Sequence, residues 1–351
     1  MVSNVIQNDN HINICLASDN NFVQHLAVTI ASILDNAKTS KVVDIYILND
    51  GSISEKNKNK IQKLTKLKAE SSINFIDIDG SIFSNMFIRR KSHFTLATYY
   101  RFLLQDLFPQ LSKIIYLDCD LVVLTDIENL YNVDLEGNYI AAVKDIIGIS
   151  NKYRLGLNHD YCNAGVMIFD LNKFRENDIQ KQLFDCAETM GNKLLWQDQD
   201  VLNIVLNGKI KILDLSWNLQ CVYDGDVTDF TEKELTEAKE NLKILHYIGK
   251  KPWTPLTDKY RGDLYFKYLE LTDYKNFKTI FNIKTFIYKL FHVCNLGQYK
   301  KVYIFGFCLR FRRKLKVLET KIQKLENELS YLKHIVKDEL KNTMGEKCKI
   351  R

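Results

Sequence analysis

Short apolar runs alternate with stretches of helical periodicity along most of the chain. Strands are predicted at 12–18, 42–50 and 72–79, and apolar residues at helical spacing predict helices at 22–37 and 54–70. Strands that alternate with helices need crossover connections, which favour a mostly parallel sheet. The pattern therefore predicts an α/β fold.

The same alternation continues through the middle of the chain. Further elements are predicted as a helix at 93–109, a strand at 112–124, strands at 138–145 and 163–170, a helix at 197–208 and a strand at 209–215. The first of these helices is expected to end near a proline, which cannot continue a helix, and the second near a glycine cap.

The character of the chain changes after about residue 260, where aromatic and basic residues become frequent. Apolar residues then keep an alternating spacing of three and four over 315–336, which is a heptad pattern. We expect four segments: a main α/β domain at 1–260, an aromatic and basic helical extension at 261–312, a short coiled-coil-like helix at 313–341 and a tail at 342–351.

Composition limits the class of protein. The chain has 351 residues, of which 46% are hydrophobic and 26% charged, and only three prolines, so long disordered linkers are not expected. Eight scattered cysteines without a C-x-x-C pair indicate reduced thiols rather than a disulfide framework or a zinc site. The beginning lacks the features of a signal peptide, and no run of about 18 apolar residues predicts a membrane span. We expect a cytoplasmic protein.

Two aspartates stand within the apolar run at 112–124. In an extended chain Asp118 and Asp120 project to the same side and Cys119 to the other. Two adjacent like charges need a neutralising partner, and paired carboxylates suit Mg²⁺ or Mn²⁺. Three other Asp-x-Asp pairs occur in the chain, so the spacing alone is a weak signal. What distinguishes this pair is its place after a buried strand, where the ligands of parallel sheets gather.

Six segments in consistent order resemble the retaining glycosyltransferases of family 8, whose bacterial members build lipopolysaccharide outer cores. They lie within residues 11–256 and read ICLASDNNF, ATYYRFLLQDLFP, IIYLDCDLVVL, YCNAGVMIFDLNKFR, WQDQDVLN and LHYIGKKPW. The resemblance implies a Rossmann-like nucleotide-sugar-binding fold of GT-A type and a UDP-hexose donor that carries glucose or galactose. It also implies Mn²⁺, with Mg²⁺ as the alternative ion, and transfer to a saccharide acceptor with retention at the anomeric carbon.

The resemblance also implies a set of site residues. Asp118, Asp120 and His246 correspond to the metal ligands of the family, and carboxylate and imidazole donors suit Mn²⁺. The remaining positions that correspond to donor-binding residues are Ala17, Asp19, Asn21, Arg101, Cys119, Asp145, Asn163, Ala164, Gly165, Asp198, Gln199, Gly249 and Lys251.

Several of these positions would contact the nucleotide. Ala17, Asp19 and Asn21 match the segment at the uridine and ribose, where carboxylate and amide oxygens accept hydrogen bonds from hydroxyl groups. A helix N-cap is the structural alternative for Asp19. Arg101 and Lys251 match positions beside the diphosphate. Lys251 is assigned by alignment to the Pro-Trp pair, because the segment before that pair is one residue shorter than in some members.

Other positions would surround the transferred sugar. Asn163, Ala164 and Gly165 match positions that bind the hexose or make room for it, with a simple tight turn as the structural alternative. Asp145 and Asp198 match positions that hold sugar hydroxyls, since oxygen acceptors are what a hexose needs.

Gln199 is expected nearest the anomeric carbon. A glutamine is a poor nucleophile, and no carboxylate in these segments is an obvious partner for double displacement. We therefore expect the acceptor to attack from the front face, with Gln199 supporting the oxocarbenium-like transition state. A phosphate oxygen of the donor would take the acceptor proton.

Two other classes of protein remain open. Haloacid-dehalogenase-like phosphatases also have an apolar strand that runs into Asp-x-Asp, as at Asp118 and Asp120, and GDVTD at 225–229 is close to their later acidic motif. Several strand-helix units precede the pair here, however, whereas the phosphatase nucleophile ends the first strand. The heptad pattern at 315–336 leaves a second alternative, a non-catalytic scaffold that binds UDP-sugars.

The basic tail suggests partners for the molecule. Aromatic and basic residues between about 280 and 316 favour contact with an anionic membrane surface, with a solvated basic face as the alternative. Peripheral binding at the inner face of the cytoplasmic membrane would suit a lipid-linked acceptor. Residues 315–336 would pair two subunits or pack on the domain. Nucleic acid is not expected, because no known binding module accompanies the charge.

Overall fold

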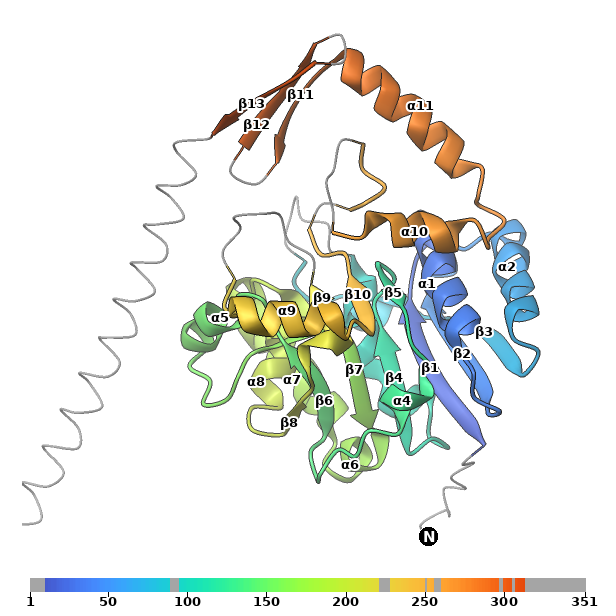
Figure 1. The fold of residues 1–351 in the computed structure, drawn as a ribbon. Coiled ribbons are helices and arrows are strands. Elements are labelled where there is room, and N and C mark those ends of the chain that lie inside the picture. Colours follow the sequence, from blue (N-terminus) through green and yellow to red (C-terminus); the bar gives the residue numbers. More distant parts are fainter. Residues whose placement is uncertain are drawn as a thin grey trace, which may run out of the picture.

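The computed structural model describes residues 10–88, 95–220, 228–249, 251–255, 260–296, 299–304 and 307–312. Its centre is a seven-stranded sheet (Figure 1). In spatial order the strands are β3 (Ser71–Asp77), β2 (Val42–Asn49), β1 (His11–Ala17), β4 (Lys113–Leu117), β7 (Cys162–Asp170), β6 (Ile140–Lys144) and β8 (Ile210–Ile212). Within this sheet β7 alone runs antiparallel to its neighbours, so the predicted mostly parallel sheet is confirmed.

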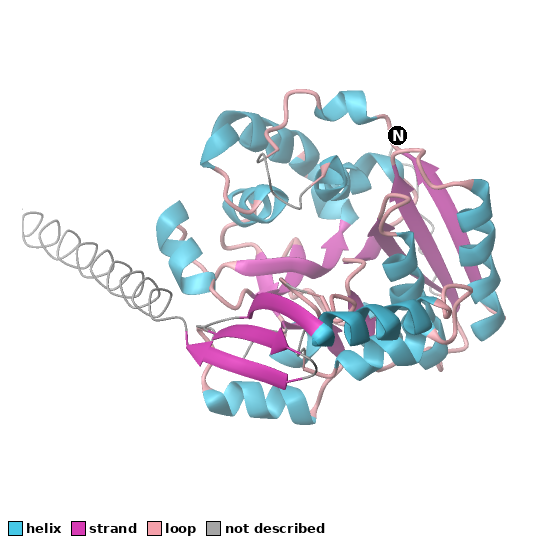
Figure 2. Cartoon of the chain, turned by 90° about the horizontal axis from the view of Figure 1, so that it is seen from above, coloured by secondary structure: helices cyan, strands magenta, loops and turns pink. Residues whose placement is uncertain are grey.

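Helices pack on both faces of this sheet, as the view from above shows (Figure 2). Alternate strand residues serve the two faces, because Ile14 and Leu16 of β1 lie in one apolar cluster and Cys15 in the other. The first cluster takes side chains from α1 (Val23–Asn36), α2 (Glu55–Gln62), α4 (Glu128–Tyr131), α9 (Glu232–Glu240) and α10 (Gly262–Leu269). The second takes them from η3 (Leu96–Leu103), α3 (Leu104–Leu107), α6 (Leu171–Glu176), α7 (Ile179–Met190) and α8 (Gln197–Val205).

A second sheet of three short strands lies against α1. Its order is β5 (Leu121–Val123), β10 (Ile244–His246) and β9 (Leu219–Gln220). The shorter elements of the described chain are η1 (Lys63–Leu67), η2 (Gly80–Phe83), α5 (Gly148–Leu155), η4 (Gly191–Lys193) and η5 (Leu215–Asn218). The small sheet matters because it joins three chain segments that are far apart in sequence.

The predicted strand at 112–124 is broken at its centre, since β4 and β5 belong to different sheets. Backbone partners explain the break. The Asp118 amide donates to the Gly165 carbonyl of β7 at 2.9 Å, whereas the Asp120 carbonyl accepts from the Tyr247 amide, just after β10, at 2.9 Å. The chain therefore changes sheets between the two carboxylates.

Some other elements are tighter or shorter than the sequence suggested. The helix expected over 93–109 is the 3-10 helix η3 followed by the single turn α3. A 3-10 turn has three residues, which sets Tyr99 and Phe102 on one side, and both are buried in the second cluster. α8 and β8 are present but shorter than the predictions for 197–208 and 209–215.

α10 belongs to the main domain. Its Leu264, Tyr265 and Tyr268 are buried in the first apolar cluster, so the boundary placed at 260 is too early. These residues fall in the stretch that we separated because it is rich in aromatic residues. The aromatic rings of α10 pack in the apolar core, so they do not mark the start of a new segment.

The extension after α10 was expected to be helical, and this is wrong for its second half. α11 (Phe277–Leu290) is a helix, but β11 (Phe291–Leu296), β12 (Tyr299–Ile304) and β13 (Phe307–Arg312) form an antiparallel sheet at the top of Figure 1. The period-two spacing of Phe307, Leu309 and Phe311 is typical of a strand, and it explains the difference.

The heptad segment 315–336 and the tail at 342–351 lie outside the described residues, so the coiled-coil-like helix and the dimer stay predictions. None of the helices that the structure describes combines the length and the apolar composition that a membrane crossing requires. The cysteines whose side chains are described as free thiols are Cys15, Cys119, Cys162, Cys186 and Cys308.

Candidate active site

A cleft opens at the carboxyl ends of β1 and β4. The strand order reverses between these neighbours, and ligands of open α/β sheets bind at such a point. The cleft has a volume of about 330 Å³, in the range of small-molecule sites. Its walls include ten of the predicted site residues: Ala17, Asp19, Asn21, Arg101, Asp118, Cys119, Asp120, Ala164, Asp198 and Gln199.

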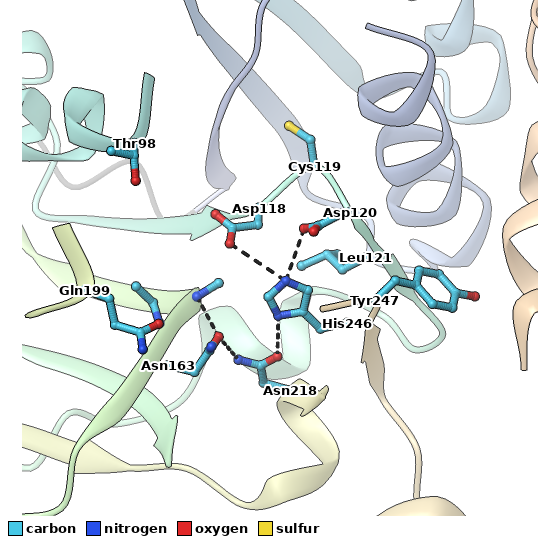
Figure 3. A network of polar contacts seen from close by, with 12 residues as sticks. Thr98, Asp118, Cys119, Asp120, Leu121, Asn163, Gln199, Asn218, His246 and Tyr247 are labelled. Carbon is cyan, nitrogen blue, oxygen red and sulfur yellow. Dashed lines mark hydrogen bonds and ion pairs between the residues drawn. The ribbon is translucent and has the colours of Figure 1, made fainter. Parts of the chain in front are cut away.

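Asp118, Asp120 and His246 come together beside this cleft, although 126 residues separate the last two. His246 Nε2 lies 3.1 Å from Asp120 Oδ1 and 3.8 Å from Asp118 Oδ2. Figure 3 marks both contacts with dashed lines. Each side chain offers one ligand atom, and these atoms lie within 4.8 Å of one another. The antiparallel pairing of β10 with β5 causes this meeting, because it sets His246 opposite Leu121, the residue after the Asp pair.

The side chains at the Asp pair alternate as expected, although the predicted strand is interrupted at this point. Cys119 points away from the imidazole (Figure 3), and its thiol donates to the Ala17 carbonyl at 3.1 Å. Burial raises the pKa of this thiol, so it stays protonated and is a poor metal ligand. Cys119 ties the turn between the carboxylates to the end of β1.

Lys251 supplies a positive charge beside the carboxylates. Its ammonium contacts Asp120 Oδ2 and donates to the Tyr247 carbonyl at 2.7 Å. Burial on its own would raise the pKa of Asp120, but Lys251 and His246 outweigh it and hold that pKa well below its usual range. Asp120 is therefore ionised at neutral pH and available as a ligand.

An aromatic cluster anchors the segment that carries Lys251. Trp253 stacks on His25 of α1 with ring centroids 3.7 Å apart, and His25 Nδ1 lies 2.8 Å from the Tyr265 hydroxyl. Burial lowers the pKa of His25 to about 3, so this ring is neutral and its role is packing. Gly249 has a φ of +64°, a left-handed conformation that glycine adopts without strain. The tryptophan of the motif thus holds the loop, and the lysine faces the carboxylates.

Arg101 joins three parts of the site. Its guanidinium donates to Asp118 Oδ1 at 2.9 Å, contacts the Ala164 carbonyl and lies 3.0 Å from Asp198 Oδ2. It also lies 4.0 Å from the Tyr116 ring and is only 4% exposed. These partners orient the two carboxylates and leave little of the guanidinium for the donor contact that the resemblance predicted.

Asp198 projects from the first turn of α8. It pairs with Arg101 and accepts a hydrogen bond from the Thr98 hydroxyl. Burial raises the pKa of Asp198 to about 6, and Arg101 and Thr98 offset this only in part. The carboxylate is therefore close to protonation under mildly acidic conditions.

The Gln199 amide is held in one orientation. Its Oε1 accepts from the Ala164 backbone amide at 3.0 Å, and its Nε2 donates to Asp145 Oδ2 at 3.0 Å and to the Tyr161 hydroxyl at 3.1 Å. Asp145 and Asn163, which were expected at the sugar hydroxyls, are each 7% exposed and bond to one another at 3.0 Å behind Gln199. In this arrangement Asp145 and Asn163 influence the cleft by orienting the Gln199 amide.

Asp19 is not the N-cap of α1, which is Phe22, but its side chain contacts the residue at that position. Its Oδ1 accepts from the Phe22 amide at 2.9 Å, which stabilises the start of α1. Together with Ala17 and Asn21 it also lines the cleft next to the end of β1.

Sequence reasoning missed four residues of the site: Thr98, Tyr161, Gln197 and Asn218. The first three stand inside the segments that carry the family resemblance, which could have signalled them. Gln197 has a φ of 38°, a strained conformation for a residue other than glycine, directly before Asp198. Asn218 Oδ1 lies 3.0 Å from His246 Nδ1, and no motif in the sequence points to it.

The residues present fit a divalent metal ion. Two carboxylates and one imidazole are the mixed oxygen and nitrogen donors that Mn²⁺ accepts, and Mg²⁺ also takes carboxylates. Gly165 makes room for the imidazole, because a Cβ at this position would lie 2.3 Å from His246 Cε1. Backbone packing therefore supports the ligand set.

Comparison with known proteins is consistent with this geometry. The profile of the family described as "Glycosyl transferase family 8" matches residues 13–257. General stress protein A of Bacillus subtilis is 30% identical over 278 residues, which cover 76% of this chain and 96% of that protein. A putative glycosyltransferase of Haemophilus influenzae is 32% identical, covering 68% and 71% of the two chains. Lipopolysaccharide 1,2-glucosyltransferase of Escherichia coli is 26% identical, covering 69% and 72%.

Solved structures share the fold. The galactosyltransferase LgtC in complex with donor and acceptor sugar analogs superposes with a TM-score of 0.64 at 24% identity, covering 75% of this chain and 96% of that one. The glycosyltransferase GlyE of Streptococcus pneumoniae gives a TM-score of 0.58 at 23% identity, covering 78% and 63%. At such identities the likeness establishes the fold alone, which is the predicted GT-A type.

Proposed function

The chain belongs to glycosyltransferase family 8, and we propose that it moves glucose or galactose from a UDP-sugar to a saccharide acceptor. Membership makes it a retaining glycosyltransferase with a sugar donor and a saccharide acceptor. The finer proposal rests on one observation: Asp118, Asp120 and His246 converge beside a cleft at the point where a doubly wound sheet binds nucleotides.

We assign the three convergent side chains to Mn²⁺, with Mg²⁺ as the alternative. When bound, such an ion acts as a Lewis acid that stabilises the negative charge developing on the departing UDP. Lys251 holds a fixed positive charge at Asp120, where it can face a phosphate oxygen of the donor. Ala17, Asp19 and Asn21 line the cleft next to the end of β1, and we assign them to the nucleoside.

Retention at the anomeric carbon requires either a covalent intermediate or attack from the face of the leaving group. Asp198 is a poor nucleophile, because its carboxylate is 4% exposed and engaged by Arg101 and Thr98. Gln199 lines the cleft with an amide of fixed orientation that can support positive charge on the sugar ring. We therefore favour front-face attack, with a donor phosphate oxygen taking the acceptor proton. A covalent adduct trapped on Asp198 or Gln199 during turnover would contradict this mechanism.

The direct test measures UDP release from a panel of UDP-sugars with Mn²⁺ and without acceptor. Slow hydrolysis of UDP-glucose or UDP-galactose is expected, and a chelator should abolish it. Asp120→Asn should lower the hydrolysis rate by at least about 100-fold. Loss of a residue that only hydrogen-bonds to a metal ligand already lowers activity about 10–100-fold, and loss of the ligand itself should lower it more.

A matched control uses another Asp-x-Asp pair of the same chain. Asp77→Asn makes the same chemical change at an exposed residue at the end of β3 and should leave hydrolysis unchanged. The proposal fails if Asp120→Asn hydrolyses the donor at the wild-type rate, or if chelation has no effect.

The two alternative classes are not supported. The family profile covers residues 13–257, and three strands precede β4 along the chain, unlike the phosphatase arrangement. The second acidic motif, at 225–229, lies mostly outside the described residues. A non-catalytic scaffold would not need Asp118, Asp120 and His246 to be arranged as ligands.

We further propose that the acceptor is a lipid-linked saccharide of a surface glycan, and that the enzyme works at the inner face of the cytoplasmic membrane. The likeness to a lipopolysaccharide glucosyltransferase supports this acceptor. Support for the location comes from α11 and β13, where Ile283, Phe286 and Phe307 are 55%, 64% and 77% exposed. Large exposed apolar side chains favour the interface between a membrane and water, and neighbouring basic residues are attracted to anionic lipids.

A further inference from the structure

A chain of hydrogen bonds runs behind the metal ligands. The Gly165 backbone amide donates to Asn163 Oδ1 at 2.9 Å, and Asn218 Nδ2 donates to the same oxygen at 2.9 Å. Asn218 Oδ1 in turn lies 3.0 Å from His246 Nδ1, and Figure 3 marks this contact with a dashed line. The chain thus links a backbone amide of β7 to an imidazole of β10.

The first link fixes the direction of the chain. A backbone N–H can only donate, so the atom of Asn163 that faces Gly165 must be the carbonyl oxygen. The Asn163 amide nitrogen then points to Asp145 Oδ2, 3.0 Å away, which can accept its hydrogen. Both neighbours require the same orientation of the Asn163 amide.

The second link transmits this direction to the imidazole. Because Asn163 presents an oxygen, Asn218 must face it with its NH₂ group, and the Asn218 oxygen is left to face His246. An amide oxygen accepts but cannot donate, so His246 Nδ1 must carry the proton. In the neutral ring Nε2 then has a free lone pair, and it is this nitrogen that faces Asp118 and Asp120.

Burial protects this chain of hydrogen bonds from competition with water. Asn163, Asn218 and His246 are 7%, 0% and 3% exposed, so solvent has little access to exchange with their partners. The absence of a side chain at Gly165 lets the imidazole and Asn163 pack against its backbone, since a Cβ there would lie 2.7 Å from His246 Nδ1 and 3.0 Å from Asn163 Oδ1.

We propose that Asn218 is a positioning residue that holds His246 in the tautomer with the proton on Nδ1, so that Nε2 is free to bind a divalent cation together with Asp118 and Asp120. The inference rests on the proposed metal site. Histidine ligands of metals commonly donate their other N–H to a fixed acceptor. In this chain that acceptor is a neutral amide, whose orientation comes from the backbone of β7.

The test uses the full chain with ¹⁵N in its seven histidines, kept metal-free at about pH 8, above the usual histidine pKa. Proton–nitrogen spectra report which ring nitrogen is protonated, and His246→Gln identifies the signal of interest. The wild type should show Nδ1–H. Asn218→Leu removes the acceptor, so the Nε2–H form should appear, and the Mn²⁺ dissociation constant measured by electron paramagnetic resonance should rise about 10–100-fold.

A rescue variant separates positioning from general damage. Asn218→Asp keeps an acceptor for Nδ1–H but loses the N–H that donates to Asn163 Oδ1, so it should retain the proton on Nδ1, which Asn218→Leu should not, and its Mn²⁺ affinity should exceed that of Asn218→Leu. Asn13→Leu alters another buried asparagine, 5% exposed and bonded to the Tyr131 hydroxyl, and should change neither readout.

The proposal is overturned if Nδ1 of His246 carries no proton in the metal-free wild type, or if folded Asn218→Leu keeps both the proton on Nδ1 and the Mn²⁺ affinity of the wild type. Failure of the wild type to bind Mn²⁺ would instead defeat the proposed metal site. The tautomer measurement separates these outcomes, because it requires no metal.

Discussion

Asp198 takes its acid-base behaviour from its surroundings rather than from its residue type. Burial raises its pKa to about 6, against the opposing effects of Arg101 and the Thr98 hydroxyl. The ionised form is the one that pairs with Arg101 and would accept a hydroxyl of the donor sugar. Protonation should therefore weaken the site as the pH falls through about 6.

This shift predicts the acid limb of the pH profile. One unit below the pKa only about a tenth of Asp198 is ionised, so kcat/KM should be about tenfold lower near pH 5 than near pH 7. Thr98→Val removes a hydrogen bond that lowers the pKa, so the limb should move to higher pH. Initial rates of donor hydrolysis over this range measure both effects. If the acid limb of the pH profile does not move in Thr98→Val, the limb reports the titration of a group other than Asp198.

At the scale of elements, helix α1 stabilises the open edge of β5. Thr29 Oγ1 donates to the Leu121 carbonyl at 2.8 Å, and Ser32 Oγ accepts from the Val123 amide at 2.9 Å. Both helix side chains are fully buried. Polar residues in the middle of an apolar helix thus satisfy an edge strand, and this strand directly follows Asp120.

Ser32→Ala should leave the Val123 amide buried without its partner. The expected loss is about 1–3 kcal/mol of unfolding free energy, the cost of an unsatisfied buried donor. Urea unfolding followed by circular dichroism measures it. Ser84→Ala, the same change at an exposed residue, should cost much less. Equal stability of the two variants would show that the edge of β5 does not depend on α1.

At the scale of the whole molecule, charge is strongly segregated. Residues 274–318 hold 11 of the 49 lysines and arginines and none of the 43 acidic residues, so the rest of the chain carries a net charge of −5. α11 and β13, which lie beyond α10 in Figure 1, belong to the same segment and carry exposed apolar side chains. A basic and apolar surface on an otherwise acidic molecule suits an anionic membrane.

This surface predicts binding to anionic lipid vesicles but not to neutral ones, in a manner that salt weakens. Replacing Lys301 and Arg310, which stand opposite one another in β12 and β13 and so share one face, by glutamine should weaken binding about 30-fold, because each basic residue near such a membrane contributes about 1 kcal/mol. Lys181→Gln with Lys233→Gln makes the same charge change on α7 and α9 and should have little effect. Vesicle co-sedimentation measures all of these, and equal binding to neutral vesicles would refute an electrostatic surface.

The alternation of elements was readable in the sequence because local periodicity reflects burial. The first three strands and the helices between them follow from their apolar spacing, and the family segments identified most residues of the cleft. The break between β4 and β5 was not readable. Both halves of the run at 112–124 are apolar and extended, and only their pairing with different partners separates them.

What the sequence determined by itself was the α/β alternation, the family and the residue types of the metal site, since these depend on local pattern and composition. The family resemblance already grouped His246 with the Asp pair, but only the tertiary structure shows how they meet, and it alone decided that Asn218 stands behind the imidazole. The physical reason is the small sheet, where β10 pairs with β5 and β9 and so joins residues that share no local pattern. The direction of the hydrogen bonds that set the imidazole tautomer is fixed only when Gly165, Asn163, Asn218 and His246 are in contact.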